Sequence, residues 1–404
     1  MHIYFSGIMG AGIGPLAILS AKVGHQIFGS DTKTSLMQGP LTDLNPTIEI
    51  GPQTGDFLAR MHQEHGIDWF IHSSAIKPDH PELLKARELG LKISKRDALI
   101  NQIIHDKDLK LIAVAGTHGK TTTTSMLIWC FQQLKVPASF LNGTTLTFAP
   151  PADYQDGSQF FIYEADEFDK NFLHFHPYLA LIPAITYDHP DIYPTPADYQ
   201  AAFDQFKSQS QHVLQDIAPD PRITLLGQHN RQNAALVYAA IHQLLPEVAP
   251  DQIIQALNTF PGSARRFEKI APNVYSDYAH HPNEIRATLQ LARELANQTN
   301  QKIIAVYEPH QNMRQKLVMD QYPWAFEEAD QVLWLPTNLS RENSDEPPIP
   351  PETFVEQLRA AGLNAEPAQL NDALLAQIRE FSHGGGLTLL LSDGPLDGFV
   401  RNHI

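Results

Sequence analysis

Short apolar runs alternate with segments of helical character along the first half of the chain. The glycine-rich turn at 7–14 leads into a predicted helix that reaches about Val23, a second helix is predicted at 81–89, and a third begins at Thr121. The apolar runs are short and bounded by turn residues, which favours buried strands. The predicted strands are 2–6, 26–29, 68–74, 91–94, 109–115, 160–163 and 179–186. This alternation predicts an α/β fold with parallel sheets.

The N-terminal segment has the form of a Rossmann-like βαβ unit. Gly10 and Gly12 belong to the glycine turn after the first strand, and Asp31 follows the second strand, where an acidic residue is placed to meet a ribose or a base. Ser73 and Ser74 end a further strand, so they could contact a ligand at the carboxyl edge of the sheet. Taken alone, such a glycine cluster first indicates a dinucleotide oxidoreductase.

A phosphate-binding loop is predicted between the strand at 109–115 and the helix that follows it. Gly116 and Gly119 allow a tight turn whose amides point into one concavity, which suits polyphosphate at a helix N-terminus. Lys120 would reach the β- and γ-phosphates and the Thr121 hydroxyl would bind Mg²⁺. Val114 stands where the full motif has its first glycine. The flanking strand and helix nevertheless predict ATP binding.

Carboxylates follow the strand at 160–163. Glu164 comes directly after the apolar run and is the best candidate for a Mg²⁺ ligand. Asp166, Glu167 and Asp169 come next, in a run whose commoner fate is a solvated loop. His189 follows the strand at 179–186 and is a second ligand candidate, because it lies in the region that carries the phosphate loop.

Length and composition restrict the interpretation further. A chain of 404 residues predicts two or three domains, and 29 Lys+Arg against 45 Asp+Glu give a net charge of −16. This charge argues against a nucleic acid or an anionic membrane as the partner. Residues 1–21 lack a basic n-region, and no apolar run reaches the ~18 residues of a membrane span, so we expect a cytoplasmic protein. Cys130 is the only cysteine and is expected to pack in a core.

Several sequence blocks together carry a family resemblance. The first are the glycine turn and Gly29-Ser-Asp31. The remaining blocks are Gly-Thr-His-Gly-Lys-Thr-Thr-Thr at 116–123, Glu-Ala-Asp-Glu at 164–167, Tyr-Asp-His-Pro-Asp at 187–191, Gly-Gln-His-Asn-Arg-Gln-Asn at 227–233, Gly-Ser-Ala-Arg-Arg-Phe-Glu at 262–268, Tyr-Ser-Asp-Tyr-Ala-His-His-Pro at 275–282 and Glu-Pro-His at 308–310. In this order they resemble the Mur ligase family, the ATP-dependent amide-forming enzymes of peptidoglycan precursor synthesis, and they cover nearly the whole chain. The glycine turn and Gly29-Ser-Asp31 resemble the UDP-binding domain of these enzymes.

The resemblance implies three α/β domains. These are a Rossmann-like UDP-sugar-binding domain at 1–108, a central P-loop ATP-binding domain at 109–261 and a Rossmann-like amino-acid-binding domain at 262–404. The stretch from 191 to 227 is shorter than is usual in the family. Two further departures are Met9, where the first turn usually has a glycine, and Gln311, where an arginine commonly follows Pro-His.

The resemblance also implies a set of site residues. Catalysis would involve Lys120, His189, Arg265 and His280. ATP would contact Gly116, Thr117, His118, Gly119, Lys120, Thr121 and Thr122 at its phosphates, His229, Asn230 and Asn233 on the adenine side, Arg265 at the phosphates and Asp277 at the ribose. Thr121, Glu164 and His189 would hold Mg²⁺ or Mn²⁺. The UDP-sugar would meet Gly10, Gly12, Asp31, Ser73 and Ser74, and the incoming amino acid would meet Tyr278, His280, His310 and Arg314.

The branch of the family is indicated by the phosphate loop. His118 in Gly-Thr-His-Gly-Lys resembles the enzymes that act directly on UDP-N-acetylmuramate, and Phe203 occupies the position where other branches carry a carbamylated lysine. His310 and Arg314 resemble the block around a small amino acid, so L-alanine is the expected acceptor. The stretch Ser392 to Gly398 looks more like the ligase that recycles the murein tripeptide. An NAD-dependent oxidoreductase and an inactive ligase-like nucleotide-binding module are the alternatives from other classes.

Overall fold

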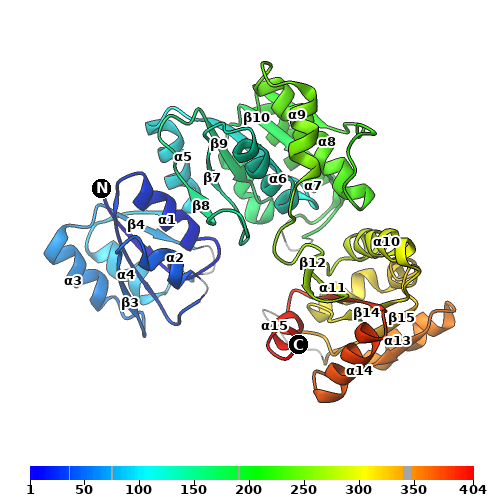
Figure 1. The fold of residues 1–404 in the computed structure, drawn as a ribbon. Coiled ribbons are helices and arrows are strands. Elements are labelled where there is room, and N and C mark those ends of the chain that lie inside the picture. Colours follow the sequence, from blue (N-terminus) through cyan, green and yellow to red (C-terminus); the bar gives the residue numbers. More distant parts are fainter. Residues whose placement is uncertain (36, 74–75, 190–191, 340–346) are drawn as a thin grey trace. The chain divides into compact units, whose positions relative to one another are not determined.

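The chain forms three sheets with helices packed against them (Figure 1). The computed structural model describes residues 1–35, 37–73, 76–189, 192–339 and 347–404. These residues form two compact units. Unit 1 comprises Met1–Arg222 and Asn233–Phe260, and unit 2 comprises Ile223–Gln232 and Pro261–Ile404.

The first sheet of unit 1 is fully parallel, with the strand order β3-β2-β1-β4-β5. Each strand predicted for this region is present, and β3 is an addition. The strands are β1 (His2–Ser6), β2 (Gln26–Asp31), β3 (Thr47–Ile50), β4 (Trp69–His72) and β5 (Lys92–Lys95). The helices are α1 (Gly14–Lys22), α2 (Gln38–Thr42), α3 (Asp56–His65), α4 (Pro81–Glu88) and α5 (Arg96–Asp106). The predicted helices at the glycine turn and at 81–89 are therefore confirmed.

A buried carboxylate joins the elements of this sheet. Glu82 lies in the first turn of α4 and is 1% exposed. Its Oε1 accepts hydrogen bonds from the hydroxyls of Tyr4 (2.6 Å) and Ser30 (2.5 Å), and its Oε2 accepts from the Ser6 hydroxyl (2.5 Å) and Gln53 Nε2 (3.0 Å). Because Ser6 is the last residue of β1 and Ser30 the last but one of β2, Glu82 fixes the two strand ends beside the glycine turn.

The second sheet of unit 1 has the order β11-β10-β6-β9-β7-β8, and all its pairs are parallel except β7 with β8. Its strands are β6 (Lys110–Val114), β7 (Ser139–Leu141), β8 (Ala152–Asp153), β9 (Phe160–Glu164), β10 (Leu179–Ile182) and β11 (His212–Gln215). The helices are α6 (Lys120–Gln133), the 3-10 segment η1 (Phe168–His174), α7 (Pro196–Gln209), α8 (Gln228–Leu244), whose first turn belongs to unit 2, and α9 (Pro250–Asn258).

The predicted strand at 179–186 is too long. The observed strand β10 ends at Ile182, because Pro183 has no N–H to donate to a neighbouring strand. Helix α7 follows in the short central region and buries Phe203, whose ring lies 5.0 Å from that of Phe172 and 5.1 Å from that of Tyr199. This position is therefore an aromatic core site.

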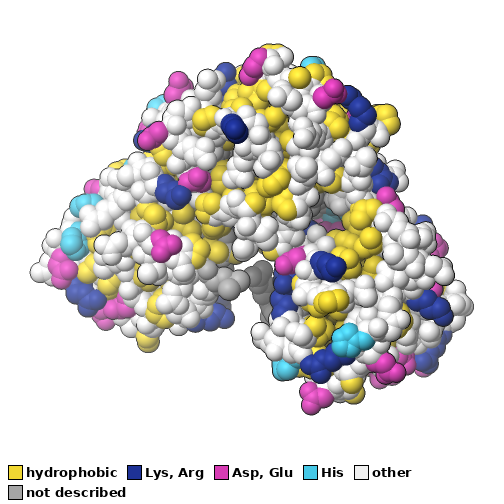
Figure 2. All heavy atoms as spheres, viewed as in Figure 1, with side chains coloured by type: hydrophobic (Ala, Val, Ile, Leu, Met, Phe, Trp, Pro, Cys, Tyr) yellow, Lys and Arg dark blue, Asp and Glu magenta, His cyan; other side chains and the backbone are white. Residues whose placement is uncertain are grey.

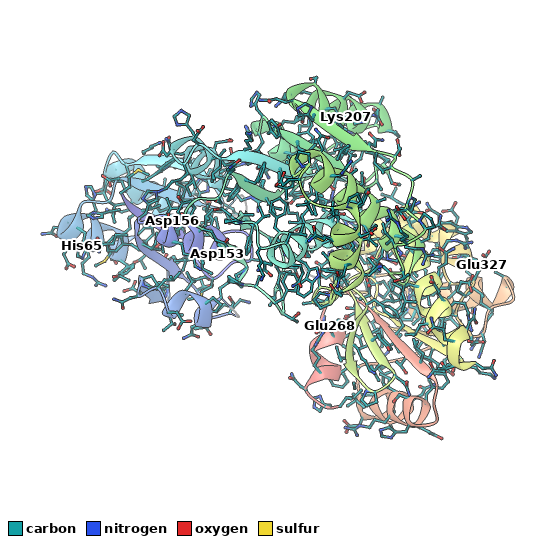
Figure 3. All side chains as sticks on the ribbon, turned by 45° about the horizontal axis from the view of Figure 1, so that its top comes forward. His65, Asp153, Asp156, Lys207, Glu268 and Glu327 are labelled. Carbon is teal, nitrogen blue, oxygen red and sulfur yellow. The ribbon has the colours of Figure 1, made fainter. Side chains whose placement is uncertain are left out.

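Cores of the two sheets of unit 1 are continuous. Buried residues of α1 and α5 belong to the same hydrophobic cluster as residues of β6 and β9. An ion pair adds to this packing, since Lys22 Nζ lies 2.5 Å from a carboxylate oxygen of Asp153, which is labelled in Figure 3. Cys130 is buried, as predicted, and burial raises the pKa of its thiol.

Unit 2 is built on the third sheet, with the order β12-β13-β17-β14-β15-β16, in which only β12 and β13 are antiparallel. The strands are β12 (Glu268–Ala271), β13 (Val274–Asp277), β14 (Ile303–Tyr307), β15 (Gln331–Trp334), β16 (Ala365–Pro367) and β17 (Leu387–Leu391). The helices are α10 (Pro282–Thr299), α11 (Asn312–Val318), the 3-10 turn η2 (Met319–Gln321), α12 (Tyr322–Ala325), α13 (Pro351–Ala360), α14 (Asp372–His383) and α15 (Leu396–Arg401).

Two separate hydrophobic clusters cover the faces of this sheet. Alternate residues of β14 and β17 pack against α10 and α13 on one face and against α14 and α15 on the other (Figure 1). Helices on both faces are characteristic of a parallel sheet. The fold is therefore α/β, as predicted.

Surface side chains of opposite charge are interspersed on the face shown in Figure 2. In the part of the chain that the structure describes, no helix combines the length and the apolarity needed to span a bilayer.

The Glu82 hub leads to a stability prediction. Substitution Glu82→Ala leaves the donors of Tyr4, Ser6 and Ser30 buried without their acceptor, and hydrogen bonds to charged groups contribute about 1.5–3 kcal/mol each. We expect the free energy of unfolding to fall by roughly 3 kcal/mol or more, measured by urea denaturation. Glu88→Ala is the control, because the Glu88 side chain is 68% exposed and pairs with Lys85 at the surface. Equal losses in the two variants would contradict the prediction.

Candidate functional site

The loop between β6 and α6 is shaped by close backbone contacts. Gly119 has a φ of +82°, and a Cβ at this position would lie 2.7 Å from Asn233 Oδ1 and 2.9 Å from Pro183 Cβ. Thr117 fastens the loop to the segment after β10, because its N donates to Ala184 O (2.8 Å) and its hydroxyl donates to Thr186 O (2.7 Å). Helix α6 begins directly after Gly119, and the backbone amides at its N-terminus suit an anion.

The ammonium group of Lys120 is enclosed by acceptors. Its Nζ donates to Gly116 O (2.6 Å) and Thr117 O (3.3 Å) and lies 2.6 Å from Oε2 of Glu167. Burial lowers the pKa of Lys120, but the carboxylate of Glu167 and its acidic neighbours raise it above its ordinary value. Burial raises the pKa of Glu167, whereas Lys120 and His189 lower it below its ordinary value. Both groups are therefore held in their charged forms.

Glu167 corrects an expectation drawn from the sequence. A solvated loop is the commoner fate of a run such as Asp166 to Asp169, yet the side chain of Glu167 is only 1% exposed. Its main-chain oxygen also accepts a hydrogen bond from the Tyr193 hydroxyl at 2.6 Å. The paired ammonium makes this burial possible, because an unpaired carboxylate would be costly to bury.

The candidate metal ligands lie around the same loop. The hydroxyl of Thr121 donates to Oε1 of Glu164 at 2.9 Å, which places two oxygen ligands side by side. His189 Nε2 lies 3.7 Å from Oε1 of Glu167 and 3.7 Å from Oδ2 of Asp188. Within the described residues, no group of three or more His, Cys, Asp or Glu could hold a metal. One or two protein oxygens suffice for Mg²⁺ when phosphate and water complete its coordination, so Thr121 and Glu164 fit a nucleotide-bound Mg²⁺.

The carboxyl edge of the first sheet holds the residues predicted to meet a UDP-sugar. Asp31 Oδ2 accepts the backbone N–H of Met9 at 2.9 Å, so this carboxylate closes the glycine turn. Gly10 donates to Gly7 O, and a Cβ on Gly12 would lie 2.9 Å from Nη1 of Arg96. Ser73 follows β4 at the same edge, while Ser74 lies outside the described residues.

The three residues predicted on the adenine side of ATP fall in different units. His229 and Asn230 belong to unit 2, and Asn233 belongs to unit 1, where it lies against Gly119. Burial, with a smaller effect of Arg231, lowers the pKa of His229 to about 4. His229 is therefore neutral at physiological pH.

Arg265 and Asp277 lie together in unit 2. Arg265 has a φ of +54°, its guanidinium donates to Ser392 O, and it lies 4.8 Å from the centre of the Tyr278 ring. The backbone N of Arg265 donates to Glu268, which is labelled in Figure 3, at 2.8 Å. The Asp277 carboxylate accepts the backbone N–H groups of Phe267 and Ala279, both at 2.8 Å, and burial raises its pKa to about 6. Asp277 thus holds this turn together, and its contact with a ribose stays a prediction.

Histidines and an arginine meet at the carboxyl edge of the third sheet. Nη1 of Arg314 lies 3.4 Å from Nε2 of His280, and the rings of His280 and His310 are 6.1 Å apart. His310 Nδ1 lies 3.1 Å from Oδ2 of Asp393. The structure therefore brings together the residues predicted to meet the incoming amino acid and adds Asp393, which the sequence interpretation did not single out.

Sequence reasoning assigned no role to Glu82, Glu167 or Asp393. Each lies near the carboxyl end of a parallel strand or on the helix beside one, yet each stands in a polar stretch that looks solvated. The one available signal is position, because Asp393 comes two residues after the apolar strand β17, much as Asp31 and Glu164 stand at the carboxyl ends of β2 and β9.

Known proteins resemble this chain along its length. Residues 2–108 match "Mur ligase family, catalytic domain", residues 114–220 match "Mur ligase middle domain" and residues 265–394 match "Mur ligase, glutamate ligase domain". A UDP-N-acetylmuramate–L-alanine ligase of Clavibacter michiganensis subsp. michiganensis (strain NCPPB 382) is 31% identical over 405 residues, which cover 86% of this chain and 81% of the relative.

Solved structures share the fold. The crystal structure of a UDP-N-acetylmuramate-alanine ligase from Thermotoga maritima has a TM-score of 0.77 at 22% identity, covering 100% of this chain and 98% of that one. A murein peptide ligase from Psychrobacter arcticus 273-4 has a TM-score of 0.63 at 22% identity, covering 100% and 99%.

The Lys120–Glu167 pair leads to a second prediction. Glu167→Gln leaves a buried ammonium without its counter-ion, so we expect the free energy of unfolding to fall by about 3–5 kcal/mol at neutral pH. Since the folded protein lowers the pKa of Glu167, this stabilisation is present above the ordinary glutamate pKa of about 4.3 and is lost as the pH falls below it. Urea denaturation across this range should therefore show the two proteins converging in acid.

Asp169→Asn is the matched control for this measurement. Asp169 pairs with Lys95 at 2.7 Å, but the two side chains are 37% and 44% exposed. Exposed pairs contribute about 0–1 kcal/mol. A loss as large as that of Glu167→Gln would show that burial does not set the strength of the pair.

Proposed function

Because this chain belongs to the Mur ligase family, we propose that it is an ATP-dependent ligase that joins L-alanine to the carboxylate of UDP-N-acetylmuramate in peptidoglycan synthesis. The observation that carries the proposal is the loop at the head of α6, where a charged lysine, a hydroxyl and a carboxylate surround a helix N-terminus. The hypothesis of an NAD-dependent oxidoreductase gives no function to the lysine, hydroxyl and carboxylate around this loop. We divide the chain at about residues 108 and 261, so that 1–108 binds the UDP-sugar, 109–261 binds ATP and 262–404 binds the amino acid.

The reaction begins with activation of a carboxylate. A carboxylate is a poor electrophile, so it first attacks the γ-phosphorus of ATP, which gives an acyl phosphate and ADP. Negative charge is spread over the oxygens of the transferring group, and preorganised cations stabilise it. Lys120 supplies one such charge from unit 1, and we propose that Arg265 supplies another. The amino group of the acceptor then attacks the acyl carbon, and phosphate leaves.

A divalent cation fits this chemistry. Thr121 and Glu164 would hold Mg²⁺ or Mn²⁺ through oxygen, with His189 nearby, and the bound ion would neutralise phosphate charge. Phe203 occupies the position of the carbamylated lysine of other branches, and its burial in an aromatic core leaves no carbamate to share the ion. Glu167 would keep Lys120 and His189 in place beside the phosphates.

L-Alanine is the acceptor that the third sheet supports best. Arg314 can pair in bidentate fashion with a carboxylate, and its contact with His280 places it at the strand ends beside Tyr278. The murein tripeptide is the second candidate, because the stretch from Ser392 to Gly398 resembles the terminal block of the recycling ligase.

Competition between acceptors tests the proposed activity. With ATP and UDP-N-acetylmuramate fixed, phosphate release is measured with L-alanine or with L-Ala-γ-D-Glu-meso-diaminopimelate. We expect the higher kcat/KM for L-alanine. A higher value for the tripeptide would reassign the acceptor while leaving the ligase chemistry intact. Absence of phosphate release with either acceptor would favour an inactive nucleotide-binding module.

The substitution Lys120→Ala tests whether ATP and UDP-N-acetylmuramate bind at separate sites. We expect kcat for ATP turnover to fall by roughly 10²- to 10³-fold or more, because the positive charge that would stabilise the transferring phosphate is lost. Binding of UDP-N-acetylmuramate, measured by calorimetry, should be nearly unchanged. Lys207→Ala is the control, because the Lys207 ammonium lies at the surface of α7, 4.0 Å from Asp204 (Figure 3). Loss of both ligands from a folded Lys120→Ala protein would refute the separate sites.

A further inference from the structure

Two acid–base side chains meet at the carboxyl edge of the third sheet. Strands β14 and β17 are parallel neighbours, so the residues that follow them lie side by side. His310 follows β14 and Asp393 follows β17, and Nδ1 of the histidine lies 3.1 Å from Oδ2 of the aspartate. The side chains are 12% and 9% exposed. This is a nearly buried histidine–carboxylate pair in close contact, but its geometry is not that of a formed hydrogen bond.

The backbone around each member is firmly held. Asn338 N donates to Pro309 O (2.7 Å), and Gln315 Nε2 donates to His310 O (3.0 Å). On the other side, Ser392 N donates to Asp277 O (3.1 Å), and the Ser392 hydroxyl donates to Glu308 Oε2 (2.5 Å). Neither side chain therefore depends on a loose loop for its position.

The surroundings favour a charged aspartate. Burial raises the pKa of Asp393, but His310, His280 and Arg265 lower it below its ordinary value. Burial raises the pKa of Glu308, the other acid at this edge. A carboxylate that faces Nδ1 of an imidazole holds its ring orientation and stabilises the imidazolium when it forms.

His280 and His310 differ in their second nitrogen. In His280, Nδ1 lies 3.2 Å from Tyr278 O. The other nitrogen, Nε2, faces the Arg314 guanidinium, and because a guanidinium can only donate, the lone pair of Nε2 is engaged by this arginine. Among the residues that the structure describes, Nε2 of His310 has no hydrogen-bond partner. His310 is therefore the histidine that can accept a proton from a ligand.

We propose that His310 is a catalytic base that removes a proton from the amino group of the acceptor, and that Asp393 is the residue that positions it. This inference rests on the proposed ligase function. An amino acid carries an ammonium group at neutral pH, which has no lone pair for attack. Nε2 takes one proton, the freed lone pair forms the C–N bond at the acyl phosphate, and the C–O bond breaks with its electron pair leaving on phosphate. The second N–H proton leaves with the phosphate or to water.

A change of nucleophile tests this assignment. Hydroxylamine is largely unprotonated at neutral pH, so it captures an acyl phosphate as a hydroxamate without needing a base. The variants Asp393→Asn and His310→Gln are assayed with ATP and UDP-N-acetylmuramate, using either L-alanine or hydroxylamine. With L-alanine we expect kcat to fall by roughly 10²- to 10⁴-fold in His310→Gln and by about 10- to 100-fold in Asp393→Asn. Hydroxamate formation should stay within about twofold of wild type.

Other outcomes overturn the assignment. A fall of equal size with both nucleophiles would make the pair merely structural, and a rise in KM for L-alanine at unchanged kcat would make it a binding contact. Asp372→Asn is the matched control, because Asp372 is exposed at the start of α14 in the same unit. If wild-type protein forms neither amide nor hydroxamate, the proposed function itself fails, and this result is distinct from all the others.

Discussion

A buried ammonium group has to be paired, and the pairing of Lys120 with Glu167 organises the centre of unit 1. The two charged atoms lie 2.6 Å apart, and the loop carbonyls of Gly116 and Thr117 take the remaining donors of the lysine. Because Glu167 also faces His189, one carboxylate links the phosphate loop to the segment after β10. The pair is not present for stability alone, since apolar side chains can often replace buried ion pairs at no cost. The pair also holds a positive charge at the N-terminus of α6, which is the property that the proposed phosphate binding requires.

Buried acidic side chains with hydrogen-bond donors also lie near strand ends in the other two sheets. Parallel sheets place all their carboxyl ends on one edge, and polar side chains collect there because the backbone leaves the sheet. In the first sheet Glu82 gathers the strand-end hydroxyls, and in the third sheet Glu308 anchors the turn that carries Asp393. Buried acids that accept hydrogen bonds from neighbouring strand ends and turns thus fix the geometry of the loops that follow the strands.

Local signals in the sequence were sufficient for much of this architecture. The glycine turn, the phosphate loop and the apolar runs predicted β1, β2, β4, β5, β6, β9 and β10, because strand and helix starts depend on neighbouring residues, whereas β3, β7, β8 and β11 were not predicted. The end of β10 was misjudged although Pro183 marks it. The burial of Glu167 could not be predicted, since it depends on Lys120, a residue 47 positions earlier in the chain. The partnership of His310 with Asp393, 83 positions apart in sequence, likewise exists only after β14 and β17 pair, because strand order is a tertiary property.

Three histidines of unit 2 have different surroundings and therefore different properties. Burial, with a smaller effect of Arg231, lowers the pKa of His229, so its imidazole is neutral. His280 receives the guanidinium of Arg314 and so helps to orient the residue that would hold a carboxylate. His310 faces Asp393 instead, and a carboxylate stabilises the positive charge that proton transfer creates. The proposed chemistry, in which an amino acid is held by its carboxylate and deprotonated at its amine, needs two such environments close together, and the rings of His280 and His310 lie 6.1 Å apart.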